Sequence, residues 1–296
     1  MAPVLKPVRG DFIGEITGFD TGKELTDADV KFVTDAIHHY AVLVFRDQIL
    51  DDDQQIDFTS RLGELHVSIA SNRTDLERRV RSDLVSDISN VGADGGILSP
   101  DDRRRIQQRA NLLWHTDNSF RHPAGAFTLL NARIVPPEAG ETEFADTRAA
   151  FDALPKAEQE RLEKLTAIHC LANSRRLAGT TGYFDAVEAE RFPPMEQPLI
   201  RLHEGSGRKA LYIGSHAQEI VGMSREDGEA LLNELLAFAT QPQFVYRHTW
   251  RVGDLVMWDN RATLHRALPF DETKYRRDLR RTATTAHGQR GPALVD

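Results

Sequence analysis

The stretch Asn-Leu-Leu-Trp-His-Thr-Asp-Asn-Ser-Phe, residues 111–120, carries the pattern on which the fold of this chain depends. At its centre is a His-X-Asp pair, His115 and Asp117, whose side chains point to the same side of an extended segment. A second histidine, His265, lies far downstream in Trp-Asp-Asn-Arg-Ala-Thr-Leu-His-Arg (258–266). Two imidazoles and one carboxylate on one face of a metal are the ligand set of non-heme Fe(II) oxygenases. His265 must then arrive from another strand, so the fold has to bring distant strands together.

The His-X-Asp pair alone does not establish a metal site. The chain has 11 histidines, so such a pair should occur about once by chance, and a surface histidine beside a solvated aspartate is the alternative. The rest of the chain has to decide between the two.

Composition excludes several classes of protein. Hydrophobic residues make up 40% of the 296 positions and charged residues 28%, as is typical of a soluble globular enzyme. There is no apolar run of about 18 residues and no apolar N-terminal region, so we expect neither a membrane span nor a secretory signal. The single cysteine, Cys170, excludes an internal disulfide, fits a reducing cytoplasm and is expected to pack as a small hydrophobic residue.

The charge balance argues against a nucleic-acid partner. The formal net charge is −8, whereas nucleic-acid binding normally requires a basic surface. The run Arg103 to Arg105 follows Asp101 and Asp102 without interleaved aromatic residues, so we interpret it as a solvated loop. The sequence leaves a homo-oligomer possible and does not specify one.

Periodicity predicts several helices. One should span 27–40 with Thr26 as N-cap, a second should span 52–62, and a third should span 148–165 with Asp146 as N-cap. Ser224 and Asp227 should cap a fourth helix, which ends near Thr240.

Short strands are predicted between these helices. They are expected at 12–16, 41–45, 127–134, 143–145, 244–247, 254–258 and 281–285, with a hairpin at 199–213 that turns at 205–207. The polar stretch 67–108 is interrupted only at 84–91, and its place just before the His-X-Asp pair suggests a lid.

Many short strands with few helices predict a mainly β fold with flanking α-helices. We expect a β-barrel or a double-stranded β-helix (jelly roll) core, forming a single domain over 1–296 with the lid at 67–108. A doubly wound α/β fold would need regular strand–helix alternation and a glycine-rich phosphate turn, and the chain has neither.

A basic cluster follows His265 in Tyr-Arg-Arg-Asp-Leu-Arg-Arg (275–281). Strand alternation would turn Arg277, Leu279 and Arg281 to one face, and two guanidinium groups facing a barrel interior would require anions. A dicarboxylate such as 2-oxoglutarate would supply one, because the planar guanidinium pairs with a carboxylate through two parallel bonds. The residues alone leave a surface strand, paired with Asp271, Glu272 or Asp278, equally open.

Beyond these patterns, the chain resembles the taurine dioxygenase superfamily of Fe(II)/2-oxoglutarate dioxygenases from about residue 12 to 286. Within it, the nearest branch is that of the 2,4-dichlorophenoxyacetate/2-oxoglutarate dioxygenases. The resemblance rests on AVLVFRDQILDDDQQIDFTSRLGEL (41–65), SDISNV (86–91), NLLWHTDNSF (111–120), GETEFADTRAAFDALP (140–155), GSGRKALYIGSHA (205–217), FVYRHTWRVGDLVMWDNRATLHRA (244–267) and RRDLRRTATT (276–285).

The resemblance implies a role for each matching residue. His115, Asp117 and His265 would bind Fe(II). Arg277 and Thr142 would hold the distal carboxylate of 2-oxoglutarate in a pocket lined by Trp258. The implied substrate residues are Arg281, near the substrate anion and the proximal carboxylate, and Asn90. His216 has a weaker claim, with a hydrogen-bonded histidine at a strand end as the alternative.

The implied reaction consumes O2 and 2-oxoglutarate and hydroxylates a small anionic aryloxyalkanoate beside its ether oxygen. Phenol and glyoxylate would form together with succinate and CO2, as in the breakdown of phenoxyacetate herbicides. A sulfonate or alkyl sulfate substrate is the alternative within the family, and a non-catalytic barrel that holds zinc is the alternative outside it.

One departure concerns the substrate anion. Relatives carry a lysine after the second helix that is implicated in holding it, whereas this chain has no lysine between Lys31 and Lys156. Arg73, Arg78 and Arg79 are the candidates to replace it.

Overall fold

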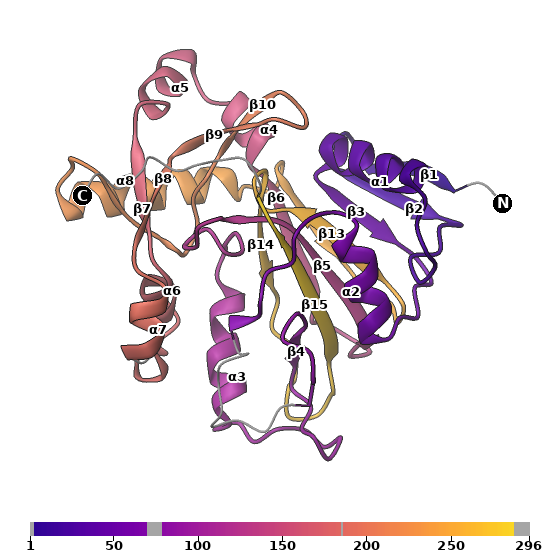
Figure 1. Ribbon diagram of the computed structural model, residues 1–296. Helices are drawn as coiled ribbons and strands as arrows, with labels where there is room; N and C mark the ends of the chain where they lie inside the picture. Colours follow the sequence, from indigo (N-terminus) through magenta and orange to yellow (C-terminus); the bar gives the residue numbers. More distant parts are fainter. Residues whose placement is uncertain (1–2, 70–78, 185, 287–296) are drawn as a thin grey trace.

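Seven strands form the main sheet of the molecule (Figure 1). The computed structural model describes residues 3–69, 79–184 and 186–286. All neighbouring strands are antiparallel except β2 and β3, which pair in parallel. In spatial order the strands are β1 (Val4–Arg9), β2 (Ile13–Thr17), β3 (Val42–Phe45), β13 (Leu255–Asp259), β5 (Gly125–Ile134), β15 (Asp278–Thr285) and β4 (Ser86–Ser89).

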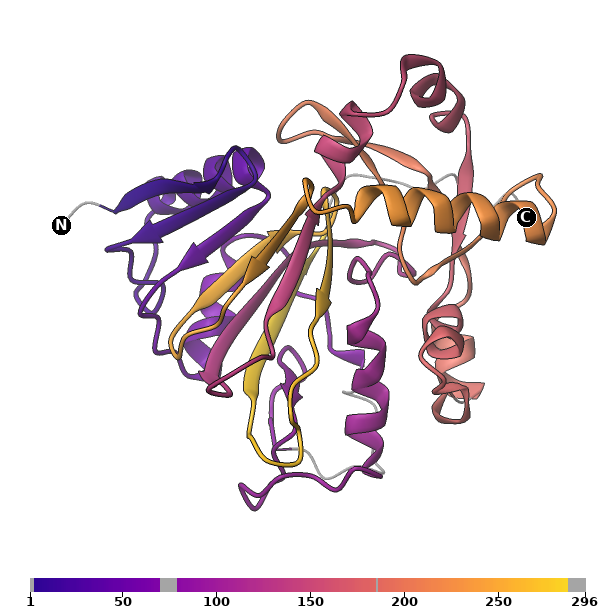
Figure 2. The same cartoon turned by 180° about the vertical axis from the view of Figure 1, so that it is seen from behind.

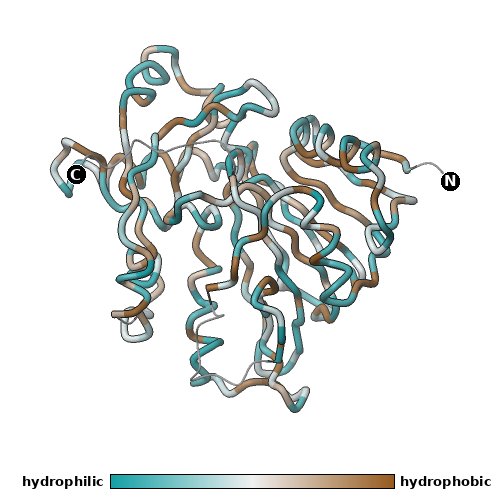
Figure 3. Tube along the Cα trace, in the orientation of Figure 1, coloured by the Kyte–Doolittle hydropathy of each residue, from teal (hydrophilic) through white to brown (hydrophobic). Residues whose placement is uncertain are grey.

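The two faces of this sheet bury different hydrophobic clusters because side chains alternate along each strand. Leu43 and Phe45 of β3 face outward and pack against Val33 and Ile37 of α1 (Asp27–Tyr40). Phe58 of α2 (Asp52–Ser60) joins the same cluster, so both helices cover one face of the sheet (Figure 1). Figure 3 shows the hydrophobic residues along β2 and β3, whereas α3 (Arg103–Gln108) is largely hydrophilic.

The inner face of the main sheet meets a second, three-stranded sheet. Its strands are β12 (Val245–His248), β6 (Thr142–Asp146) and β14 (Thr263–Ala267), with β6 in the middle. Phe144 of β6 packs against Val44 and Trp258 of the main sheet and is fully buried. The two facing sheets form the expected jelly-roll core, and β14 brings His265 into its interior.

A flanking layer covers the outer side of the smaller sheet. Leu264 of β14 packs there against Phe151 of α4, Leu162 of α5 and Leu235 of α8. The view from behind shows α8 spanning this layer (Figure 2). Between β6 and β12 the chain forms α4 (Thr147–Asp152), α5 (Lys156–Leu162), β7 (Thr166–His169), α6 (Leu171–Leu177), η3 (Thr181–Tyr183), α7 (Ala186–Arg191), β8 (Met195–Pro198), β9 (Ile200–His203), β10 (Arg208–Leu211), β11 (Ala217–Ile220) and α8 (Arg225–Ala239).

Local signals predicted several of these elements correctly. Helix α1 has the predicted bounds, and the Thr26 side chain accepts a hydrogen bond from the backbone N–H of Asp29 in a capping box. The hairpin of β9 and β10 and the Ser224 cap of α8 are also confirmed. Cys170 is buried and unpaired, as expected.

Two expectations are wrong. The helix predicted at 148–165 is two helices, because the chain turns at Ala153–Leu154 and Pro155 begins α5 as its N-cap, where its missing N–H breaks no helical bond. Arg103 to Arg105 lie in α3 rather than in a solvated loop, and Arg105 forms an ion pair with Glu272. The sequence also left six strands unpredicted: β1, β4, β7, β8, β11 and β14. Among the described residues, no helix is long and apolar enough to cross a membrane.

Candidate active site

The three candidate metal ligands meet where the two sheets face each other. His115 precedes β5, and its backbone N–H and C=O pair with those of His265 at 3.0 and 2.8 Å in an isolated β-bridge. One ligand atom from each of His115, Asp117 and His265 lies within 4.8 Å of the others, and all three residues are buried. Asp117 is central: its carboxylate oxygens lie 3.9 Å from His115 Nε2 and 3.7 Å from His265 Nε2. Residues 150 positions apart therefore share one site, as the spacing of the motif predicted.

The protonation of the cluster suits a divalent cation. His115 Nδ1 lies 2.7 Å from the carbonyl oxygen of Leu113, which can only accept, so Nδ1 carries the proton and the Nε2 lone pair faces the cluster. Burial lowers the pKa of both His115 and His265, which keeps the imidazoles neutral. Burial alone would raise the pKa of Asp117, but the Arg281 guanidinium holds it well below its usual range. Two neutral imidazoles and one carboxylate are a donor set that binds Fe(II).

Asn260, which the sequence did not single out, ties the Asp117 ligand to the sheet. Its Oδ1 accepts hydrogen bonds from the backbone N–H of Asp117 at 3.0 Å and from Trp258 Nε1 at 3.1 Å. Its Nδ2 donates to Thr128 Oγ1 at 2.8 Å, and the Thr128 hydroxyl donates to Asp117 Oδ2 at 3.0 Å. The Asn260 amide thus holds the backbone of Asp117 directly and its carboxylate through Thr128. The only local signal was a polar residue directly after a buried strand.

A small cavity of about 80 Å³ opens on one side of the cluster and is lined by Arg277, Thr142, Trp258 and His265. Arg277 is buried, its Nε has no hydrogen-bond partner, and it forms no ion pair within the described residues. Burial lowers the pKa of Arg277 to about 10, so the side chain is still a cation near neutral pH. Thr142 Oγ1 accepts from Trp250 Nε1 at 3.0 Å, which leaves its hydroxyl hydrogen available to donate. This cavity is therefore equipped for a carboxylate.

The surface-strand alternative for 275–281 is wrong. Strand β15 is largely buried, Asp278 pairs with Arg79 and Arg280, and Glu272 pairs with Arg105. Neither carboxylate forms an ion pair with Arg277. A barrel that merely held zinc would also give this buried cation no function.

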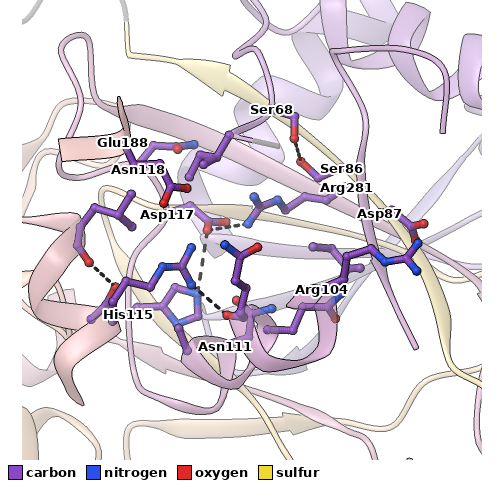
Figure 4. Close-up of a pocket in the computed structure, with 18 of the residues that line it drawn as sticks. Ser68, Ser86, Asp87, Arg104, Asn111, His115, Asp117, Asn118, Glu188 and Arg281 are labelled. Atoms are coloured by element: carbon purple, nitrogen blue, oxygen red, sulfur yellow. Dashed lines mark hydrogen bonds and ion pairs between the residues drawn. The ribbon is translucent and has the colours of Figure 1, made fainter. Parts of the chain in front are cut away.

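A larger cavity of about 190 Å³ lies on the other side of the cluster (Figure 4). Arg281 lines both cavities, and its Nη1 donates to Asp117 Oδ1 at 2.9 Å. His216 and Phe120 supply aromatic walls, with ring centroids 4.7 Å apart. His216 Nδ1 has no hydrogen-bond partner, so the alternative of a histidine bonded at a strand end lacks support at this nitrogen. The segment 67–108 contributes many of the remaining walls: Ser68, Ile69, Arg79, Val80, Val85, Ser86, Asp87, Ile88, Arg104, Gln107 and Gln108.

Two predicted anion or substrate residues have other partners. Asn90 lines neither cavity; its Nδ2 donates to the carbonyl oxygens of Glu272 and Tyr275, and its Oδ1 accepts from the backbone N–H of Arg277. Its side chain is thus used to hold the segment that leads to Arg277. Arg79 borders the larger cavity, but its guanidinium forms ion pairs with Asp87 and Asp278. Arg73 and Arg78 lie outside the described residues.

Similarity to known proteins extends over nearly the whole chain. The family model described as taurine catabolism dioxygenase TauD, TfdA family matches residues 5–283. The chain is 45% identical to the alpha-ketoglutarate-dependent 2,4-dichlorophenoxyacetate dioxygenase of Burkholderia sp. (strain RASC), over 92% of this chain and 91% of that protein. It is 35% identical to the (S)-phenoxypropionate/alpha-ketoglutarate-dioxygenase of Sphingobium herbicidovorans, over 92% and 91% of the two chains. The crystal structure of AAD-2 in complex with Mn(II) and N-oxalylglycine matches with a TM-score of 0.90 at 41% identity, covering 96% of this chain and 98% of that one.

Proposed function

The chain belongs to the TauD, TfdA family and is a 2-oxoglutarate-dependent dioxygenase that requires Fe(II) and O2; on this premise we propose that it hydroxylates an aryloxyalkanoate beside the ether oxygen. The observation that carries the proposal is the pair of unlike cavities on the two sides of the His115–Asp117–His265 cluster. The smaller cavity suits a dicarboxylate. The larger one combines aromatic walls with a guanidinium, as an aryl acid requires.

Each cavity has its own task in this proposal. His115, Asp117 and His265 would hold the iron, which supplies O2 activation coupled to the conversion of 2-oxoglutarate into succinate and CO2. Arg277 and Thr142 would bind the distal carboxylate of 2-oxoglutarate, with Trp258 as a wall of the same cavity. Losing water from this buried pocket strengthens the charge-assisted bond that Arg277 can make.

On the substrate side, Phe120 and His216 would pack against the aryl ring, and Arg281 would bias the acid end of the substrate toward the cluster. Burial holds the pKa of His216 well below its usual value, so this wall is uncharged and compatible with a ring. Hydroxylation of the carbon beside the ether oxygen produces a hemiacetal, which breaks into a phenol and, from an aryloxyacetate, glyoxylate. The names of the relatives in Burkholderia and Sphingobium support this substrate class.

We further propose that the chain works as one catalytic domain, with residues 67–108 as the lid over the larger cavity. A catabolic role in the cytoplasm, in the breakdown of aryloxyalkanoate herbicides, fits the substrate class and the single buried cysteine.

A substrate panel tests the proposal. The purified enzyme, with Fe(II) and 2-oxoglutarate, is given phenoxyacetate, each enantiomer of 2-phenoxypropionate, taurine and an alkyl sulfate, and succinate is measured together with the product. We expect an aryloxyalkanoate to give the highest kcat/KM with one phenol per succinate. If taurine or the alkyl sulfate exceeds every aryloxyalkanoate, the substrate class is wrong although the dioxygenase chemistry remains.

A further inference from the structure

Arg121 places a guanidinium beside the larger cavity. It directly follows Phe120, a wall of that cavity. Its Nη1 donates to the carbonyl oxygen of Val67 at 2.9 Å, and its Cζ lies 4.8 Å from the centre of the Phe192 ring. The Nε and Nη2 atoms are shielded from solvent without a hydrogen-bond partner. Within the described residues Arg121 forms no ion pair.

Several other arginines with little exposed surface form ion pairs with a carboxylate. Arg148 pairs with Asp146, Arg46 with Asp254, and Arg280 with Asp278. Such pairing is expected, because a buried guanidinium without an anion is costly.

Like Arg121, Arg277 has no ion pair among the described residues. It lines the cavity that we propose takes a carboxylate of 2-oxoglutarate. An unmatched guanidinium is tolerated where a ligand supplies the anion. Applied to Arg121, the same reasoning points to an anion on the substrate side.

The space next to Arg121 fits one end of an acid. A niche lined by Arg121, Arg281, His66 and Asn118 adjoins the larger cavity. The two share the lining residues Ser68, Ile69, Ser86, Asn118 and Arg281. Its volume of about 10 Å³ corresponds to roughly one water-sized atom, so it admits a carboxylate oxygen but no ring.

The niche carries net positive charge. Burial and the neighbouring Arg191 and Arg281 lower the pKa of Arg121 to about 10, so it remains a cation near neutral pH. Burial and Arg121 lower the pKa of His66 to about 4, so this imidazole is neutral there. The Asp117 carboxylate opposes this decrease in the pKa of Arg121, but it already accepts a hydrogen bond from Arg281.

We propose that Arg121 and Arg281 together form the subsite for the substrate carboxylate, an inference that rests on the proposed aryloxyalkanoate function. In this arrangement one carboxylate oxygen enters the niche, while the ring stays in the larger cavity against Phe120 and His216. The carbon between the carboxylate and the ether oxygen then lies on the side of Asp117. Arg281 orients the acid, but part of its positive charge is balanced by Asp117. Arg121 supplies a second positive charge for the substrate carboxylate.

The test compares Arg121→Gln and Arg121→Lys with a matched control, Arg191→Gln. Arg191 is exposed and lies 5.2 Å from the centre of the same Phe192 ring, so its loss removes a nearby charge without altering the niche. The dissociation constants of phenoxyacetate and of the uncharged phenoxyethanol are measured by anaerobic titration of the enzyme loaded with Fe(II) and 2-oxoglutarate. Thermal unfolding of each variant is recorded alongside.

We expect Arg121→Gln to weaken phenoxyacetate binding by about 10- to 100-fold, the loss typical of a charge-assisted contact. Phenoxyethanol binding and the KM for 2-oxoglutarate should stay within about twofold of wild type, Arg121→Lys should recover most of the loss, and Arg191→Gln should match wild type. The inference is overturned if Arg121→Gln binds phenoxyacetate as tightly as wild type does. It is also overturned if the variant loses the same factor of affinity for phenoxyacetate and for phenoxyethanol. If the wild-type enzyme binds no aryloxyalkanoate at all, the proposed function itself fails, and this result is distinct from either of the others.

Discussion

The two cavities beside the metal cluster are built from different parts of the chain. The smaller one draws Thr142 from β6, Trp258 from β13 and His265 from β14, together with residues of 108–115 and 268–277. The larger one is lined mainly by segments outside the core sheets, including 67–108, α6 and the turn that holds Phe120. A site on paired strands is rigid, whereas loops vary readily. The difference suggests that the barrel maintains the part of the reaction common to the family and that the outer segments select the substrate.

Catalysis should depend on all three residues of the metal cluster between the two cavities. His115→Ala, Asp117→Ala or His265→Ala should each abolish succinate formation and strongly reduce bound iron, because two remaining ligands hold Fe(II) poorly. Succinate production and iron content per chain measure the effect. Turnover near the wild-type rate in any of the three variants would remove that residue from the ligand set.

Arg277→Leu should damage the smaller cavity alone. Loss of a buried, charge-assisted contact costs about 2 to 5 kcal/mol, so the KM for 2-oxoglutarate should rise by about 30-fold or more. Iron content should not change. The exposed neighbour Arg276 provides the control, Arg276→Leu, which should behave as wild type. If Arg281→Leu shows the 2-oxoglutarate defect and Arg277→Leu does not, the two arginines have been assigned in the wrong order.

Asn260 tests whether the strand framework also sets the geometry of the metal ligand. Asn260→Ala should lower iron affinity by about 10- to 100-fold, as is typical when a group that orients a ligand is removed. Thr128→Val should lower it less, because it leaves the bond between the Asp117 backbone and Asn260 intact, and Thr128→Ser should restore it. Equilibrium iron titration separates this role from a loss of folding, which thermal unfolding reports. Equal melting temperatures and equal iron affinity in Asn260→Ala and wild type would exclude the role.

The smallest effect is expected on the loop-built side. His216→Phe keeps an aromatic wall and replaces an imidazole that is already uncharged, so the KM for phenoxyacetate should change by only about two- to fivefold. The KM for 2-oxoglutarate should be unaffected, since His216 does not line the smaller cavity. A larger shift for 2-oxoglutarate than for phenoxyacetate would mean that the two cavities do not work separately.

Much of the fold could be predicted because its signals are local. The Thr26 cap and apolar spacing determined α1, and turn residues at 205–207 determined the hairpin of β9 and β10. The apolar periodicity of 148–165 predicted one helix, but Pro155 divides this stretch into α4 and α5. Strand β14 was missed because Thr263–Ala267 is short and its partner β6 is distant in the sequence.

The sequence by itself determined the residue types of the site: a His-X-Asp pair on one side of an extended segment, a distant histidine, and arginines two to four residues apart near the end of a strand. These follow from backbone periodicity, which any short stretch contains. Only the tertiary structure decided which partner each polar group has. It assigned the Asn90 amide to the segment before Arg277, joined Asp117 to Asn260 and, among the described residues, gave Arg121 no ion pair. Such pairings depend on residues far apart in the chain, and no local pattern encodes which of several arginines or amides will meet which partner once the sheets close.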